Sequence, residues 1–214
     1  MPTLLTFGDS NTYGTLPIQT EGKRDRLNAN DRWPCLVRRD LGPDWMLIEE
    51  GLPGRTTCHP DIELGPYMDG RVGLFIALES HGPIDFLTLM LGTNDLKTKF
   101  DLSPDQIAAD LDTLLGIALS DEMQDRHDVF DILLICPAPI LEQGEIAEKF
   151  IGGATKSLKL ANLFGEVAAA RHVDFLDAGT VIESSAIDGI HLDKTMHARL
   201  AKAVAITLKE MDGI

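Results

Sequence analysis

The stretch Leu4-Leu5-Thr6-Phe7-Gly8-Asp9-Ser10-Asn11-Thr12-Tyr13-Gly14 decides how the fold of this sequence is interpreted. Its apolar run ends at Gly8, a pattern typical of a buried strand that gives way to a loop. Asp9 and Ser10 follow directly after that predicted strand. Functional side chains of α/β proteins gather in loops at the carboxyl ends of strands, so Ser10 is the first candidate for a reactive residue.

Further segments resemble this first strand because they are almost continuously apolar rather than alternating. Strands of this kind are buried on both faces, as in a parallel sheet that helices cover. The segments are 45–48, 86–91, 132–136 and 173–176.

Apolar residues recur at helical spacing between the predicted strands, which indicates helices that cover the sheet. These stripes lie within 33–41, 107–118, 160–167 and 196–208, with a further helix expected around 72–78. Ser103 is the expected N-cap of the second stripe's helix, with Pro104 in the first turn and Gln106 completing a capping box.

The alternation of strands and helices predicts one α/β domain over residues 1–214, built on a doubly wound parallel sheet. In such sheets the site lies outside the carboxyl ends of the strands. Two polar stretches, 19–32 and 59–69, are expected to form long loops that serve as walls, lids or contact arms.

Composition narrows the range of partners. The net charge is −15, from 19 Lys and Arg against 34 Asp and Glu. Such a charge repels nucleic-acid backbones and anionic membranes, so neither is an expected partner. No apolar run approaches the ~20 residues of a membrane helix, and no pattern of a secretory signal is seen. Cys35, Cys58 and Cys136 show no CxxC spacing, which fits a reducing compartment, so a cytoplasmic location is expected.

Several polar residues suggest nucleophilic catalysis. A serine hydroxyl needs a base to accept its proton, and a carboxylate that orients that base. Asp188 and His191 are close enough for the carboxylate to reach the imidazole within one turn, with the other ring nitrogen directed at Ser10. The N–H groups of Ser10 and Gly54, with the side-chain amide of Asn94, are the candidate donors to an oxyanion.

Other polar residues have competing interpretations. His197 is a rival base, but it falls within a regular helical pattern. Cys58, His59 and Asp61 have the chemistry of metal ligands, yet no second cluster completes a site, so no metal is expected. Asp95 is interpreted as a helix cap. Arg55 and Lys97 are either ion-pair partners within the protein or residues that line the site.

Four blocks together resemble the SGNH (GDSL) hydrolase family, in the family's order. They are Gly8-Asp9-Ser10, Gly51-Leu52-Pro53-Gly54, Gly92-Thr93-Asn94-Asp95 and Asp188-Gly189-Ile190-His191. The sequence around them is similar to bacterial aryl esterases that also act as acyltransferases and perhydrolases. The resemblance implies Ser10 as nucleophile, His191 as base and Asp188 as its orienting carboxylate. It implies an oxyanion hole made by Ser10, Gly54 and Asn94.

The resemblance also implies a three-layer, flavodoxin-like sheet of about five strands, with no metal or cofactor. In the subgroup, extended loops help to build a ring-like octamer, and residues 15–32 and 59–70 are the matching candidates here. A homo-oligomer is therefore expected, with an octamer as its specific form.

Two residues depart from the family pattern. Asn11 replaces the leucine of the GDSL block, and Tyr13 stands where the family often has tryptophan. Both are candidate residues of the substrate pocket, and Asn11 is expected to make its first wall more polar.

The function expected from these residues is hydrolysis of short-chain acyl or aryl esters through an acyl-enzyme, with acyl transfer to alcohols or peroxide as a further capacity. One alternative is O-deacetylation of a carbohydrate or metabolite by the same residues. Another is a noncatalytic module that binds a small molecule. Nucleotide binding and the α/β-hydrolase fold are disfavoured, because G-x-G-x-x-G, P-loop and G-x-S-x-G motifs are absent from the sequence.

Overall fold

A five-stranded parallel sheet forms the centre of the molecule, with the strand order β2-β1-β3-β4-β5. The computed structural model describes residues 1–20, 22–23 and 25–213. The strands are β1 (Thr3–Gly8), β2 (Met46–Gly51), β3 (Phe86–Met90), β4 (Asp131–Cys136) and β5 (Asp174–Asp177). This is the flavodoxin-like order, in which the chain direction across the sheet reverses beside β1. The predicted fold class is confirmed.

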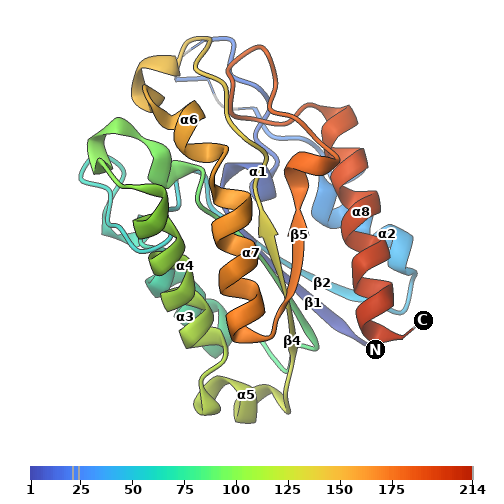
Figure 1. Ribbon diagram of the computed structural model, residues 1–214. Coiled ribbons are helices and arrows are strands. Elements are labelled where there is room, and N and C mark those ends of the chain that lie inside the picture. The colour runs from blue at the N-terminus through green and yellow to red at the C-terminus, as the bar shows by residue number, and fades with distance from the viewer. Residues whose placement is uncertain (21, 24, 214) are drawn as a thin grey trace.

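Helices cover both faces of the sheet and complete three layers (Figure 1). On one face lie α2 (Trp33–Leu41) and α8 (Lys194–Asp212), and on the other lie α3 (Gly70–Ser80), α4 (Pro104–Ala118) and α7 (Leu160–Arg171). Each face has its own cluster of buried apolar side chains. Shorter helical segments connect these elements: α1 (Ser10–Tyr13), α5 (Asp121–His127), α6 (Gly153–Ser157), and the 3₁₀ turns η1 (Pro66–Met68), η2 (Asn94–Leu96), η3 (Thr98–Phe100), η4 (Ala147–Phe150) and η5 (Ala178–Thr180).

The start of α4 confirms the predicted capping box. The Gln106 N–H donates to Ser103 Oγ at 3.2 Å, and the Ser103 N–H donates to Gln106 Oε1 at 2.8 Å. Pro104 occupies the first turn, where its missing N–H leaves no donor unpaired.

The second strand begins and ends later than the sequence predicts. Trp45 lies before it, with its ring 5.3 Å from that of Phe86 in the core. β2 continues through Glu49 and Glu50 because it is an edge strand, which pairs on one side only and keeps its charged side chains partly in solvent. The short α5 and α6 escaped prediction, since neither is long enough to show a helical stripe.

The carboxyl ends of β1, β2 and β3 meet at one edge of the sheet. Gly8 is in register with Gly51 of β2 and with Met90 of β3. A Cβ added at Gly51 would lie 2.3 Å from the backbone nitrogen of Tyr13, so glycine lets α1 sit directly on this edge. The residues that follow these strands are therefore brought together.

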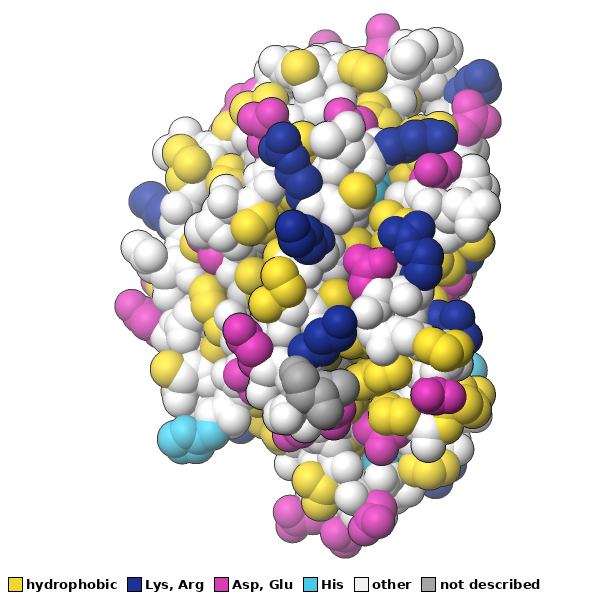
Figure 2. All heavy atoms as spheres, turned by 90° about the vertical axis from the view of Figure 1, so that its right-hand side faces the viewer, with side chains coloured by type: hydrophobic (Ala, Val, Ile, Leu, Met, Phe, Trp, Pro, Cys, Tyr) yellow, Lys and Arg dark blue, Asp and Glu magenta, His cyan; other side chains and the backbone are white. Residues whose placement is uncertain are grey.

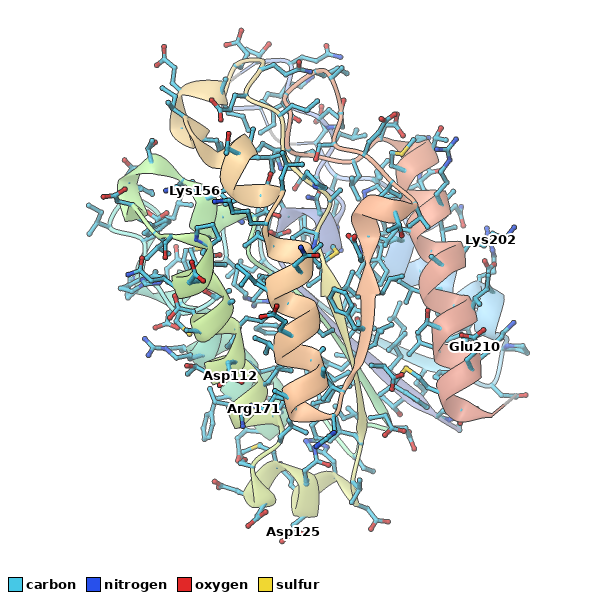
Figure 3. All side chains as sticks on the ribbon, in the orientation of Figure 1. Asp112, Asp125, Lys156, Arg171, Lys202 and Glu210 are labelled. Atoms are coloured by element: carbon cyan, nitrogen blue, oxygen red, sulfur yellow. The ribbon has the colours of Figure 1, made fainter. Side chains whose placement is uncertain are left out.

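The surface mixes charges of both signs. On the face that Figure 2 shows, Lys and Arg side chains are interspersed with Asp and Glu. Asp112 of α4 and Arg171 at the end of α7 point toward each other, with two contacts of 2.6 Å (Figure 3).

Within the described ranges no helix has the length and apolar character needed to cross a membrane. The cysteines are unpaired, and Cys136 is buried in the core as expected.

Candidate active site

Ser10, His191 and Asp188 form one hydrogen-bonded chain. Ser10 Oγ lies 3.1 Å from His191 Nε2, and His191 Nδ1 lies 2.6 Å from Asp188 Oδ2. A carboxylate only accepts, so Nδ1 carries the proton and Nε2 is left free to accept the serine hydroxyl. The structure thus brings together the predicted nucleophile, base and orienting carboxylate, although Ser10 and His191 lie 181 residues apart along the chain.

Backbone donors fix the Asp188 carboxylate in place. Its Oδ1 accepts from the N–H groups of Ile190 and His191, and its Oδ2 accepts from the Ile18 N–H at 2.7 Å. Burial alone would raise the pKa of Asp188, but the hydrogen bond and charge of His191 and these N–H groups hold it below its usual value. The group is therefore ionised and rigidly placed at neutral pH.

A tight turn gives this loop its shape. Gly189 has φ +74°, and a Cβ there would lie 2.0 Å from the carbonyl oxygen of Leu141. The Leu141 N–H donates to the Gly189 carbonyl, and the Ser185 N–H donates to the His191 carbonyl. Only glycine fits this position, so the Asp-Gly spacing is a requirement of the turn.

Asn11 lies against the histidine loop and does not line the cavity beside Ser10. Its Nδ2 donates to the Ile190 carbonyl and its Oδ1 accepts from the Leu192 N–H, both at 3.2 Å. The expectation that Asn11 forms a polar pocket wall is therefore corrected, because α1 turns its side chain away from the cavity.

Tyr13 is likewise absent from the cavity lining. The Arg26 guanidinium lies over its ring, 4.1 Å from the centroid, and Arg26 Nε donates to the Tyr13 carbonyl. Tyr13 thereby secures the start of the 15–32 loop.

The three predicted oxyanion donors surround the same space, but they are not equally free. In the described part of the chain, no hydrogen bond engages the N–H of Ser10 or of Gly54. Gly54 has φ +97°, which favours glycine where backbone approaches a ligand. The Asn94 amide donates to the Arg55 carbonyl at 3.0 Å and to Asp9 Oδ2 at 3.2 Å. A substrate oxyanion at this place would compete with Asp9 Oδ2 for the Asn94 amide, because that hydrogen bond is the longer of the two.

Asp9 is a site residue to which sequence reasoning gave no role. It accepts from the Asn11 N–H at 2.9 Å, which caps α1, and from the Asn94 amide, so it links the serine turn to the oxyanion region. Burial raises the pKa of Asp9 to about 6, against the lowering effect of the Asn11 hydrogen bond and the His191 charge. An aspartate at a helix N-cap was the available signal.

A cavity of about 390 Å³ opens beside Ser10 and His191. Its apolar walls come from loops that follow different strands: Ile18, Pro53, Leu64, Ile146, Phe150 and Ile190. Charged side chains complete the lining: Glu63, Lys97, Lys99, Glu148 and Lys149. A cavity of this size and composition suits a small molecule that has both apolar and polar groups.

Arg55 and Lys97 take different positions. Arg55 is buried, donates to the Gly8 and Glu50 carbonyls, and covers the Phe7 ring at 4.0 Å. Burial lowers the pKa of Arg55 to about 10, which leaves it charged at neutral pH. Arg55 therefore ties the ends of β1 and β2 together, whereas Lys97 lines the cavity.

The rival assignments are settled by contacts. His197 is fully buried, and its Nδ1 accepts from the Trp33 N–H at 3.1 Å, so it joins α8 to α2. Burial lowers the pKa of His197 to about 4, and His197 does not line the cavity.

Asp95 does not cap a helix. It accepts hydrogen bonds from the N–H and the hydroxyl of Thr57, which anchors the loop after β2. His59 pairs with Asp110 at 2.7 Å, and the described residues contain no metal-binding cluster.

Solved structures similar to this chain include esterases. An aryl esterase from M. smegmatis shares 31% identity with a TM-score of 0.93, covering 98% of this chain and 99% of its own. A carbohydrate acetylesterase from Sinorhizobium meliloti shares 32% identity with a TM-score of 0.93, covering 99% of this chain and 100% of its own. A lipase/acylhydrolase from Enterococcus faecalis, at 19% identity and a TM-score of 0.64, covers 99% of this chain and 97% of its own and shares the fold.

Among curated proteins, no sequence matches this chain. The model of one protein family matches residues 6–199, which include the strand edge and every residue of the Ser10–His191–Asp188 chain. The sequence blocks, the strand order and this match agree, and the chain belongs to the GDSL-like lipase/acylhydrolase family.

Proposed function

We propose that this carboxylic-ester hydrolase acts on short-chain acyl or aryl esters through an acyl-enzyme on Ser10. The observation that carries the proposal is the Asp188–His191–Ser10 chain at the wall of a small cavity that has both apolar and charged side chains in its lining. The dimensions of the cavity favour short acyl and aryl groups over long chains.

Each residue has a defined role in the proposed reaction. Ser10 Oγ attacks the ester carbonyl as its proton passes to His191 Nε2, and the Asp188 carboxylate stabilises the imidazolium. The carbonyl oxygen becomes an oxyanion that accepts from the Ser10 and Gly54 N–H groups and from Asn94. The C–O bond to the alcohol then breaks, His191 protonates the leaving oxygen, and water repeats the sequence on the acyl-enzyme.

Hydrolysis of 4-nitrophenyl acetate tests the proposal. Ser10→Ala and His191→Ala should each lose nearly all activity while keeping the thermal unfolding temperature of the wild type. His172→Ala is the matched control, because His172 is exposed between the end of α7 and the start of β5, at the amino-terminal edge of the sheet and away from the cavity. Equal rates in all four proteins would refute the assignment, and ester binding without turnover would favour a noncatalytic module.

O-deacetylation of a carbohydrate is a second candidate, favoured by the similarity to the carbohydrate acetylesterase from Sinorhizobium meliloti. The same chain of residues performs both reactions, so substrate comparison separates them. A kcat/KM for an acetylated sugar that exceeds the value for phenyl acetate would identify deacetylation as the main activity. Adding an alcohol or peroxide to the same assay tests acyl transfer, which would appear as a new ester or a peracid.

Self-association is part of the proposal and is supported by one exposed apolar face, the α3 face. Val72, Phe75 and Ile76 lie on the same side of α3, and Ile62 and Tyr67 of the preceding loop are also exposed. Apolar groups concentrated in this way mark interaction surfaces. Sedimentation velocity would show an assembly, with an octamer as the form that the family resemblance implies. The Ile76→Glu substitution should weaken that assembly.

A cytoplasmic location also belongs to the proposal and is supported by the unpaired cysteines.

A further inference from the structure

Lys97 places an ammonium group at the wall of the cavity without a hydrogen-bond partner. Its side chain is only 10% exposed, and within the described ranges no acceptor lies within hydrogen-bond distance of Nζ. The nearest carboxylate oxygen, Asp61 Oδ2, is 3.9 Å away. The side chain is largely withdrawn from solvent while its ammonium faces the cavity with donors that no group in the described part of the protein engages, so a ligand that brings acceptors is favoured there.

The nearby acidic groups make their closest contacts with a different lysine. Lys99 Nζ contacts Asp61 at 2.7 Å and Glu63 at 3.0 Å. Asp61 also accepts from the N–H groups of Glu63 and Leu64. Asp61 is therefore shared between two lysines, and the closer contact belongs to Lys99. The Lys97 ammonium therefore keeps donors that no group of the described residues engages by a hydrogen bond, although the two lysines and the two carboxylates balance in charge.

We infer that Lys97 is an anion-binding subsite of this cavity, and that the preferred esters carry a carboxylate or similar anionic group. This inference rests on the proposed function, because the subsite and Ser10 line the same cavity. An anionic group at Lys97 gains charge-assisted hydrogen bonds in a partly desolvated space. The apolar walls hold the rest of the molecule, and His191 and Ser10 act on its ester bond.

A competing role for Lys97 is to stabilise the oxyanion from a distance, since its charge interacts with Asp9 near Asn94. The two roles predict different effects on ester hydrolysis when Lys97 is replaced by a neutral residue. Support of the oxyanion acts on every ester, whereas an anion subsite acts only on anionic ones. A comparison of matched substrates therefore separates them.

Two pairs of esters provide the test. 4-Acetoxybenzoate and its methyl ester differ in charge on the leaving side, and mono(4-nitrophenyl) adipate and its methyl ester differ on the acyl side. For at least one pair, the ratio of kcat/KM for the anionic to the neutral ester should fall about 10-fold or more in Lys97→Met, as expected for one charge-assisted contact. Lys97→Arg should largely retain the wild-type ratio.

Lys202→Met is the matched control, because Lys202 is exposed on the outer side of α8 (Figure 3) and its loss changes the net charge equally. Its ratios should match those of the wild type. Unchanged ratios in Lys97→Met, or an equal fall for all four esters, would overturn the inference. If the wild type hydrolyses none of them, the proposed function itself fails.

A measurement on the wild type alone covers the case of an unfolded variant. Benzoate and benzamide have nearly the same shape and differ in charge. Benzoate should inhibit hydrolysis of a neutral ester about 10-fold more strongly than benzamide at pH 7. Equal inhibition, or stronger inhibition by benzamide, would also overturn the inference.

Discussion

The side-chain amide of Asn11 holds the backbone on both sides of His191. It donates to the carbonyl of Ile190 and accepts from the N–H of Leu192, and all of these groups are buried. The indole N–H of Trp33 in turn donates to the Asn11 carbonyl at 3.1 Å. The residue next to the proposed nucleophile therefore holds the loop of the proposed base at two points of the backbone.

Asn11→Leu, which restores the family's usual residue, should damage the protein. A leucine leaves a buried carbonyl and a buried N–H without partners, which should lower the free energy of unfolding by about 2–4 kcal/mol. Because His191 loses its two-point support, kcat should fall by about 10- to 100-fold, with little change in KM. Asn30→Leu is the control, since Asn30 is exposed. Full activity and stability in Asn11→Leu would show that the loop around His191 keeps its conformation without the Asn11 hydrogen bonds.

Asp188→Asn should remove most of the activity. An amide cannot serve the three backbone N–H groups and His191 Nδ1 together, so the imidazole loses its orientation and the imidazolium its counter-charge. We expect kcat to fall by about 1,000- to 10,000-fold. Asp193→Asn is a matched control, because Asp193 caps α8 and asparagine caps equally well. Comparable activity in the two variants would contradict the role of Asp188.

The lowered pKa of Asp188 also predicts a pH dependence of stability. The folded pKa lies below the unfolded value, so the stabilisation by Asp188 is complete above about pH 4 and is lost as the pH falls through the folded pKa. Urea unfolding of the wild type and Asp188→Asn should therefore converge in acid. A constant difference between them down to pH 2 would argue against this effect.

Asp9 predicts the opposite trend. Burial raises its folded pKa to about 6, above the unfolded value, so the folded state binds more protons between about pH 4 and pH 6. Across that interval the stability of the wild type relative to Asp9→Asn should decrease by up to about 3 kcal/mol as the pH rises. Urea unfolding at pH 4 and pH 7 measures the change. A difference that does not vary with pH would mean that Asp9 keeps an ordinary pKa.

The anion preference should depend on the charge of Lys97. Burial lowers the pKa of Lys97 to about 8, opposed by nearby carboxylates and assisted by Lys99. The groups that face it come from several loops: Asp9, Asp61, Asp95 and Lys99, with Glu63, Glu148 and Lys149 in the same cavity. The anionic-to-neutral ratio of kcat/KM should hold at pH 7 and decline above pH 8, as Lys97 loses its proton. Lys97→Arg should keep the ratio at pH 9.5, and a ratio in the wild type that does not change with pH would count against Lys97 as the source.

The sequence was sufficient to predict the fold and the meeting of Ser10, Asp188 and His191, but it placed Asn11 and Tyr13 in the cavity wall, where they do not lie. Continuous apolar runs indicate buried parallel strands, and residue type with spacing singled out Ser10, Asp188 and His191. The contacts of Asn11 depend on the direction that a four-residue helix gives its side chain, which no periodicity reveals. The isolation of Lys97 depends on Lys99 reaching Asp61 across a folded loop, which a linear sequence does not show.

The contacts between Ser10 and His191, Ile18 and Asp188, and Asn11 and Leu192 each join residues at least 170 positions apart. A chain emerging from the ribosome holds the proposed nucleophile long before the proposed base, so Ser10 has no histidine partner until the last loop has docked. Recovery of esterase activity during refolding would therefore time the closing step of folding and not the early formation of the sheet.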